Sequence, residues 1–325
     1  MRPGDDATTP RLPATLGGPG FRTRTRSHRA DVEEGRIWRS CGYASETAPL
    51  LEVVMGWPPD TLVSRRPADE DLLLERPDLR RMRAQALLIE GYFRAHGVSV
   101  HWVCDAEAPP NIVFMRDLFF MTPEGAIIAR PAAHQRAGEA RIVAARLAEL
   151  GAPILATVHG RGCFEGADAL WLDDRTVLIG LGRTNEEGAA QVEHVLSTIG
   201  ATAIRVAVPP RIQHLLGAVT LVEPGCAILH ARAEGTEIET VLRAHGIYVA
   251  ILEEDDELTL SRAMNLVVLD GGKFVMPAGA PRAADRYRRT GWSPDALEIG
   301  EYLKCGGGLG CLVGIFRRRT PAAED

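Results

Sequence analysis

The strongest constraint on the fold is a unit that recurs along the chain. Two short apolar runs joined by a turn are followed by a helical stretch and a third apolar run, at intervals of roughly 50 residues. Turns of this kind, rich in Pro, Gly and Asp, are typical of β-hairpins; they are TPEG (122–125), DDR (173–175), PG (224–225) and GG (271–272). Hairpins and helices that recur at a regular interval indicate modules arranged around a central axis.

The same pattern predicts the helices and the closure of the ring. The last apolar run, within residues 309–318, has no hairpin partner downstream and is predicted to pair with the run at residues 49–56. The sequence therefore predicts an α/β fold, a five-module α/β propeller of pseudo-fivefold ββαβ repeats, with an irregular α+β sandwich as the alternative. Helical stretches are predicted over residues 137–150, 185–199, 236–245 and 282–290.

The beginning of the chain differs from the rest. Residues 1–36 are rich in Pro, Gly, Thr and Arg and show no apolar period, so we predict a flexible N-terminal extension with at most one ordered segment near its end. Residues 37–325 are predicted to form a single domain, long enough to bury a large core.

Composition excludes several classes of function. The net charge of −6 argues against a protein that binds nucleic acid through a basic surface. No apolar run approaches the about 18 residues of a membrane-spanning helix, and the N-terminus lacks the apolar core of a signal peptide. The six cysteines have no metal-binding spacing, so we predict reduced thiols, no metal site and a cytoplasmic location.

Cys311 and His214 are candidate catalytic residues. Cys311 follows the glycine-rich run 306–310, where the backbone can approach a substrate closely. It could be a nucleophile or a small core residue, and Cys305 in the same loop competes with it. His214 lies between a Pro-bounded loop and a predicted strand, where it could shuttle protons for a thiol or be a half-buried loop residue.

Two acids and two arginines are further candidates. Asp117 and Glu165 lie in or beside apolar strands, and a carboxylate in such surroundings needs a cationic partner, either a substrate or an internal arginine, which Arg116 or Arg130 could provide.

Arg136 and Arg183 precede helical stretches, where they could hold a carboxylate or lie on the surface. A cysteine, a histidine and two acids on loops of one ring would suit attack on a guanidinium carbon.

With these residues the chain resembles the guanidino-group-modifying enzymes of the pentein superfamily. These comprise arginine deiminases, dimethylarginine dimethylaminohydrolases and amidinotransferases, and the order and spacing of the motifs are most similar to those of the dimethylarginine hydrolases. The resemblance extends from about Ser45 to Phe316 and is carried by SETAPLLEVVMG, PPNIVFMRDLFF, ARPAAHQRAGE, FEGADAL, IGLGRTN, QHLLG and GGGLGCLVGIF.

The resemblance implies a catalytic domain with its active site in the central channel of the propeller. Cys311, rather than Cys305, would be the nucleophile, and His214 would be the general acid and base. Glu165 would be the acid that holds both the substrate guanidinium group and His214.

The resemblance also implies how a substrate is held. Asp117 would bind the guanidinium nitrogens, Arg136 and Arg183 would bind the amino-acid carboxylate, and Asn111 would lie near the α-amine. The implied partner is a small cationic guanidino compound, with no nucleic acid and no membrane, and a homodimer is a possible assembly. Residues 55–77 could supply a lid over the channel.

Two departures leave the substrate open. Arginine deiminases and amidinotransferases typically carry His-x-Asp, whereas here His214 is followed by Leu215 and Leu216. The dimethylarginine hydrolases also lack that acid, which leaves room for an N-substituent. Residues 115–117 (MRD) and Asn111 instead look like the deiminase pattern.

The resemblance therefore predicts a cysteine-dependent hydrolase that acts on the guanidino carbon of arginine or of an N-substituted arginine. A covalent thiouronium intermediate would lead to a citrulline-type product and an amine, without any cofactor. The alternative is an amidinotransferase, in which an amine instead of water receives the amidino group. A non-catalytic binding protein of the same fold is the third interpretation.

Overall fold

The computed structural model describes residues 12–319, and in this part of the chain the strands form five three-stranded sheets. In four of them the first strand pairs antiparallel with the second, and the second pairs parallel with the third. These four sheets are β3 (Phe119–Thr122), β4 (Gly125–Ile128) and β5 (Ile154–Thr157); β6 (Ala169–Trp171), β7 (Thr176–Leu181) and β8 (Thr202–Ala207); β9 (Val219–Glu223), β10 (Cys226–His230) and β11 (Tyr248–Leu252); β12 (Val267–Asp270), β13 (Lys273–Pro277) and β14 (Ser293–Leu297).

The fifth sheet joins the two ends of the domain. Strand β1 (Leu50–Gly56) pairs parallel with β2 (Ser99–Val103) and antiparallel with β15 (Val313–Arg318), with Val53 opposite Ile315. The predicted closure of the ring by the first and last strands is therefore confirmed, and so is the five-module α/β propeller.

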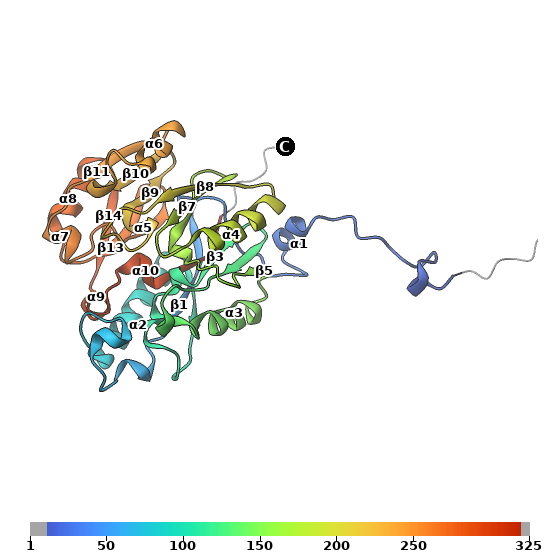
Figure 1. The fold of residues 1–325 in the computed structure, drawn as a ribbon, viewed down its shortest axis with the longest axis horizontal. Helices are drawn as coiled ribbons and strands as arrows, with labels where there is room; N and C mark the ends of the chain where they lie inside the picture. Colours follow the sequence, from blue (N-terminus) through green and yellow to red (C-terminus); the bar gives the residue numbers. More distant parts are fainter. Residues whose placement is uncertain (1–11, 320–325) are drawn as a thin grey trace, which may run out of the picture.

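One long helix follows the second strand of each sheet and covers the outside of its module. Figure 1 shows these five helices around the periphery and the short helix α10 (Leu309–Leu312) near the centre. In α4, for example, Asn185 caps the helix through the Gly188 N–H, and Val192 and Leu196 are fully buried against the sheet. The five helices are α2 (Leu79–Ala95), α3 (Glu139–Glu149), α4 (Glu186–Thr198), α6 (Glu237–Ala244) and α8 (Pro281–Arg289).

Shorter helices lie in the loops between and within the modules; they are α5 (Leu215–Ala218), α7 (Asp256–Thr259) and α9 (Gly300–Lys304). Within residues 12–319, no helix combines the length and the apolar composition needed to cross a bilayer.

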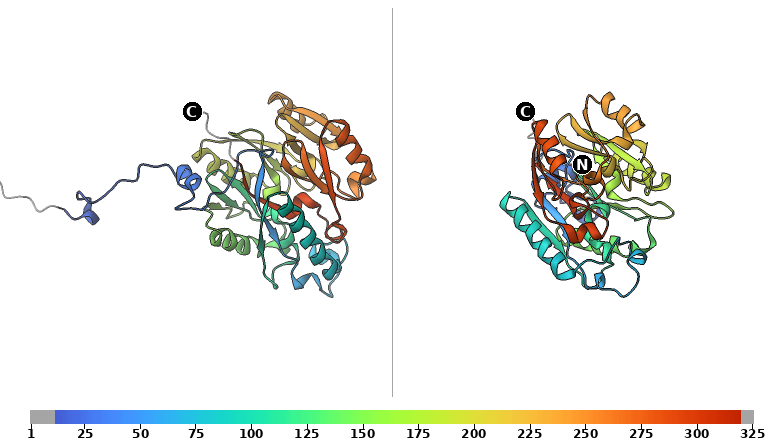
Figure 2. Two further views of the ribbon diagram at one scale, coloured as in Figure 1. Left: turned by 180° about the vertical axis from the view of Figure 1, so that it is seen from behind. Right: turned by 90° about the vertical axis from the view of Figure 1, so that its left-hand side faces the viewer.

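The N-terminal segment carries one helix that touches the ring. Helix α1 (His28–Glu34) buries Val32 in the main core, and the His28 ring bonds the Glu124 carbonyl at 3.0 Å. Figure 2 shows the preceding described residues running away from the ring. The predicted extension spans residues 1–36, of which residues 1–11 lie outside the described part, and its flexibility stays a prediction.

The strands β3, β6, β9, β12 and β15 occupy equivalent places in the five sheets. We call them the inner strands, because residues of β6, β9, β12 and β15 line one central cavity. Their apolar residues are almost completely buried, so the middle of the ring is rigid and its strand ends are fixed in space.

The sequence pattern was wrong about the residues that lead into two inner strands. The apolar run at residues 111–121 predicts that the first hairpin begins at residue 111, but residues 110–117 form two 3₁₀ turns, Pro110–Val113 (η4) and Met115–Asp117 (η5). Pro109 and Pro110 lack N–H groups for a strand ladder, which favours turns here. Cys311 was expected at the start of a strand but lies on the single turn of α10 that precedes β15.

Candidate active site

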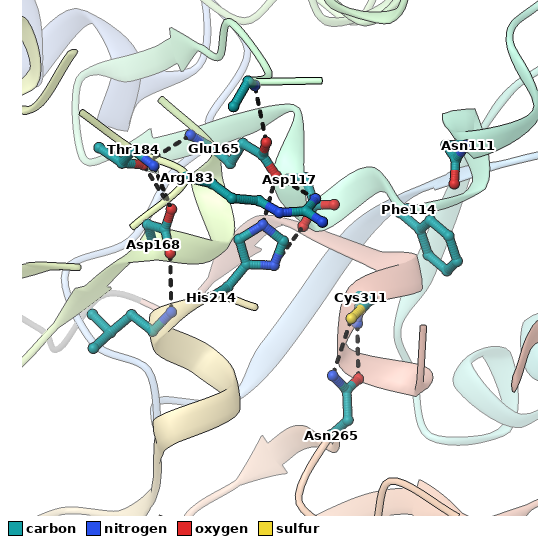
Figure 3. Close-up of polar contacts among 12 residues, drawn as sticks. Asn111, Phe114, Asp117, Glu165, Asp168, Arg183, Thr184, His214, Asn265 and Cys311 are labelled. Carbon is teal, nitrogen blue, oxygen red and sulfur yellow. Dashed lines mark hydrogen bonds and ion pairs between the residues drawn. The ribbon is translucent and has the colours of Figure 1, made fainter. Parts of the chain in front are cut away.

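Each module places one polar side chain just before its inner strand. Asp117, Glu165, His214, Asn265 and Cys311 precede β3, β6, β9, β12 and β15 respectively. Because the same ends of the inner strands meet in the ring, the five side chains converge on one site. Figure 3 shows His214 and Asp117 on one side of a space, Phe114 on the other, and Cys311 with Asn265 beneath it.

His214 is held in place by Glu165. The imidazole Nε2 lies 2.5 Å from Glu165 Oε2, and both side chains are buried. The other oxygen, Glu165 Oε1, accepts a hydrogen bond from the Ala132 N–H at 3.0 Å. The carboxylate is therefore engaged at both oxygens and fixes the imidazole so that Nδ1 faces Asp117, with 3.9 Å between Nδ1 and Asp117 Oδ1.

Asp168 fixes the backbone next to His214. Its carboxylate accepts hydrogen bonds from the Leu215 N–H at 3.0 Å and from the Thr184 hydroxyl at 2.7 Å. The Leu215 amide is one of the unsatisfied donors at the start of α5, so a carboxylate there stabilises the short helix. Burial raises the pKa of Asp168 to about 6, although these hydrogen bonds oppose the rise.

The surrounding carboxylates keep His214 protonated. Burial alone would lower the imidazole pKa, but the charge of Asp117 and the hydrogen bond to Glu165 outweigh it and raise the pKa to about 9. The pKa of Glu165 is held at about 2 because the contact with His214 and the nearby arginines outweigh its burial. At neutral pH the pair is thus an imidazolium ion and a carboxylate, and His214 can donate a proton.

Asp117 is bound to a guanidinium group that belongs to the protein itself. Arg136 is 2% exposed, and its Nη1 donates to Asp117 Oδ2. Its remaining donors bond Glu139 Oε2 and the carbonyl oxygens of Asn111 and Phe114. The internal partner of Asp117 is thus Arg136 and not Arg116 or Arg130, which was wrongly expected. The predicted role of Arg136 in binding a substrate carboxylate stays a prediction.

The second oxygen of Asp117 is free. Asp117 Oδ1 is buried and has no hydrogen-bond partner within the described residues. A buried carboxylate oxygen without a partner is costly. This oxygen lies 3.9 Å from the imidazolium Nδ1 (Figure 3), and the charge of Asp117 acts on the Cys311 thiol, so a guanidinium N–H brought next to the thiol would find an acceptor here.

Cys311 is held from two sides by Asn265. The Asn265 Nδ2 amide donates to Cys311 Sγ at 3.0 Å, and Asn265 Oδ1 accepts from the Cys311 N–H at 3.0 Å. Burial raises the thiol pKa, the charge of Asp117 raises it further, and the Asn265 hydrogen bond opposes both effects. Cys305, in contrast, is 1% exposed, and burial raises its pKa to about 12, so it is a core residue.

The glycine-rich run before Cys311 is required by close packing. A Cβ at position 307 would lie 2.1 Å from the Phe114 ring, and one at position 308 would lie 2.7 Å from the Asn265 side chain. Glycine therefore lets Phe114 and Asn265 pack directly against the loop that carries the thiol.

Arg183 and Asn111, predicted to bind the amino-acid end of a substrate, lie at the edge of this space. The Arg183 side chain is 35% exposed, and its Nη1 lies 3.7 Å from Glu165 Oε2. Asn111 is buried and donates from Nδ2 to the carbonyl oxygen of Asp71 at 2.7 Å, a residue of the segment predicted to form a lid. Arg183 therefore has donors free for a ligand, whereas the Asn111 amide already has a partner.

The group Asp117, Glu165 and His214 also has the chemistry of a metal site, because one ligand atom from each lies within 4.8 Å of the others. Arg136 Nη1, however, already bonds Asp117 and lies 4.0 Å from Glu165 Oε2. A divalent ion would have to share the site with this guanidinium group. The guanidinium group of Arg136 therefore already supplies the positive charge that these two carboxylates would otherwise draw from a metal ion.

Comparison with known proteins agrees with this geometry. A profile of the family described as arginine deiminase matches residues 103–214. The chain is 30% identical, over 253 residues, to the N(G),N(G)-dimethylarginine dimethylaminohydrolase of Streptomyces coelicolor, and the match covers 78% of this chain and 89% of the relative. This chain belongs to the guanidino-group-modifying enzymes of the pentein superfamily. Like the dimethylarginine hydrolases among its relatives, it is a guanidino-modifying hydrolase.

Solved structures of pentein enzymes share the fold. A cysteine-to-serine mutant of the dimethylarginine dimethylaminohydrolase of Pseudomonas aeruginosa, complexed with citrulline, superposes with a TM-score of 0.68 at 23% identity, covering 83% of this chain and 100% of that chain. The amidinotransferase SxtG of Microseira wollei superposes with a TM-score of 0.71 at 15% identity, covering 86% and 98%. These two likenesses establish the pentein propeller.

Sequence reasoning missed three residues of the site. Asn265 begins the fourth hairpin motif, Asp168 lies in the FEGADAL motif, and Phe114 precedes Asp117. Only Asn265 left a usable signal, because it stands two residues before its inner strand, as Asp117 and Cys311 do before theirs.

Proposed function

We propose that the chain hydrolyses the guanidino group of arginine or of an N-substituted arginine, with Cys311 as the nucleophile. The observation that carries this proposal is Asp117 Oδ1, a buried acceptor without a hydrogen-bond partner that lies 3.9 Å from the imidazolium Nδ1, on a carboxylate whose charge acts on the Cys311 thiol (Figure 3). The free thiols of all six cysteines favour a reducing compartment such as the cytoplasm.

In the first step the Cys311 thiolate attacks the guanidino carbon. The substrate's positive charge lowers the thiol pKa on binding, and the Asn265 amide stabilises the thiolate. As the Sγ–C bond forms and the C–N bond to the departing amine breaks, His214 donates its Nδ1 proton to the amine nitrogen. The product of this step is a covalent thiouronium group on Cys311.

In the second step the now neutral His214 takes a proton from water. The hydroxide adds to the thiouronium carbon, the Sγ–C bond breaks, and a ureido product such as citrulline leaves. Glu165 keeps the imidazole oriented through both proton transfers because its own oxygens are fully bonded. Asp117 holds the guanidinium nitrogens planar against the thiol.

The test is product analysis by mass spectrometry. Purified protein is incubated with arginine, Nω-monomethylarginine or asymmetric dimethylarginine, each with and without glycine. We expect citrulline without added amine. Ornithine that forms only when glycine is present would replace hydrolysis with amidino transfer.

Two cysteine variants make the test specific. Cys311→Ser should abolish turnover, whereas Cys305→Ser, in the same loop but buried in the core, should retain it. A folded Cys311→Ser protein that still forms citrulline would overturn the assignment of the nucleophile. In acid-quenched wild-type enzyme, the peptide that contains Cys311 should carry the mass increment of a thiouronium group that keeps the ornithine part of the substrate, whereas the increment of an amidino group alone would indicate amidino transfer.

A further inference from the structure

A large cavity extends from Cys311 and His214 away from the predicted amino-acid end of the substrate. Its volume is about 450 Å³, and Cys311, His214 and Asn265 line it, whereas Arg183 and Asn111 are not among the described residues in its wall. Cavities of roughly 300–1,000 Å³ accommodate drug-sized ligands. The two methyl groups of dimethylarginine would fill a small part of this space.

The wall of this cavity is positively charged. The residues that line it include five arginines and only two acidic residues, Glu46 and Glu254. Each glutamate is paired, Glu46 with Arg116 at 3.2 Å and Glu254 with Arg232 at 2.7 Å. The three other arginines form no ion pair within residues 12–319; they are Arg211, Arg262 and Arg318.

Arg318 contributes positive charge from a buried position. It is 3% exposed, its Nε has no hydrogen-bond partner, and Nη1 donates only to the Ala48 carbonyl at 2.7 Å. Burial lowers its pKa to about 10, so it is still cationic at neutral pH. An unneutralised buried guanidinium favours an anion in the same cavity.

Arg211 and Arg262 are close in the sequence to two residues of the site. Arg211 precedes His214 by three residues, and Arg262 precedes Asn265 by three. Both have left-handed backbone conformations, with φ of 69° and 52°. Non-glycine residues adopt this conformation at a cost that the surrounding structure must support. Both residues line the cavity, and Arg262 is near enough to the thiol that its positive charge acts to lower the pKa of Cys311.

We propose that this cavity receives the departing amine of the substrate, and that this amine carries a carboxylate bound by Arg211 and Arg262. The inference rests on the proposed function, whose substrate class it narrows to arginines bearing a carboxyalkyl group on the terminal nitrogen. In the reaction the C–N bond to the carboxyalkyl amine breaks, His214 supplies its proton, and water supplies the oxygen of citrulline. The second product is an amino acid.

The experiment compares two substrates of the same shape that differ in charge. Nω-carboxymethylarginine carries the carboxylate, and Nω-carbamoylmethylarginine carries a neutral amide in its place; asymmetric dimethylarginine is the reference. We expect kcat/KM for the carboxymethyl compound to exceed that for the carbamoylmethyl compound by about tenfold or more, because a charge-assisted bidentate contact is gained. In the Arg211→Gln/Arg262→Gln double variant this ratio should fall to about one.

Arg243→Gln provides the matched control, because Arg243 lies on α6, pairs with Glu239 and is outside the cavity wall. It should leave the ratio as in the wild type. Hydrolysis of dimethylarginine with a ratio near one in the wild type would overturn this inference and leave the proposed function in place. A high ratio that the double variant retains would overturn the assignment to these two arginines. If folded wild-type protein hydrolyses none of the three compounds or arginine, both proposals fail.

Discussion

Asn265 and Cys311 exchange two hydrogen bonds, one from the Asn265 amide to the thiol sulfur and one from the Cys311 N–H to the Asn265 carbonyl oxygen, each 3.0 Å long. The residues come from neighbouring modules of the ring, before β12 and β15. This pairing fixes both the position of Sγ and the backbone that carries it. Asn265 is therefore a positioning residue for the nucleophile.

Replacing Asn265 by Asp should keep the acceptor for the Cys311 N–H and remove the donor to Sγ. The thiolate would lose a hydrogen bond and gain a like charge, so the thiol pKa should rise. We expect kcat to fall by about tenfold to a hundredfold with little change in KM. The readout is the pH dependence of Cys311 alkylation by iodoacetamide, which should shift to higher pH. An unchanged alkylation profile in a folded variant would show that Asn265 has only a structural role.

The activity should be greatest on the alkaline side of neutrality. His214 must be protonated in the first step, and its pKa is raised to about 9, so its proton is lost only above that pH. The thiol pKa is raised by burial and by Asp117, so the thiolate becomes more abundant as the pH increases. Measured from pH 6 to 11, kcat/KM for dimethylarginine should rise toward about pH 9 and then fall. A maximum below pH 7 would contradict this assignment of protonation states.

The two arginines near Glu165 should behave differently when changed to Gln. Arg183 is 35% exposed, and its one ion pair within residues 12–319 is with Glu165, at 3.7 Å, so Arg183→Gln should raise KM for arginine-type substrates by about tenfold. Agmatine, which lacks the carboxylate, should show no such change in KM. If the variant raises KM equally for both compounds, Arg183 does not bind the carboxylate.

Arg136→Gln should act mainly on stability. Arg136 is fully buried and bonds Asp117 and Glu139, so its loss leaves buried carboxylates unpaired, which costs about 3–5 kcal/mol. Chemical denaturation should show a reduced free energy of unfolding, with Arg183→Gln as the nearly neutral control. Equal stability of the two variants would contradict the internal role of Arg136.

Gly308→Ala should displace Asn265 from Cys311 without replacing either of these two residues. The new Cβ would lie 2.7 Å from the Asn265 side chain, which must move away from Cys311. We expect a drop in kcat and the same alkaline shift of alkylation as in Asn265→Asp. Gly91→Ala, on the surface of α2 where a Cβ meets nothing within 4 Å, is the control and should leave both measurements unchanged.

Much of the propeller could be predicted because each repeat is marked by residues that are close together in the sequence. Turn residues, such as those at 224–225 and 271–272, and apolar alternation mark each hairpin, and the predicted helix at 185–199 agrees closely with α4. The helix α2 and the strand β2 were missed because the sequence before them, with prolines and charges at 58–78, shows no clear period. The pairing of the first and last strands could be predicted because the apolar run within residues 309–318 has no hairpin partner downstream.

The sequence predicted most of the residues of the site, but it did not predict which side chains bond one another. Resemblance brought Cys311, His214, Glu165 and Asp117 together, and the structure places all four around one space (Figure 3). No local signal shows that Arg136 bonds Asp117, because the two residues are 19 positions apart in the sequence. The thiol's partner Asn265 was also missed, since a single asparagine before an apolar run is indistinguishable from a turn residue.

The strand that carries the nucleophile is also the strand that closes the ring. Cys311 precedes β15, and β15 takes its place only by pairing with β1, the first strand of the domain. During synthesis, four modules and their acids and histidine can form before the last thirty or so residues emerge, but none of these partial structures holds an activated thiol. The active site is therefore complete only when β15 pairs with β1 and closes the ring. A chain truncated before Cys311 would have no catalytic activity.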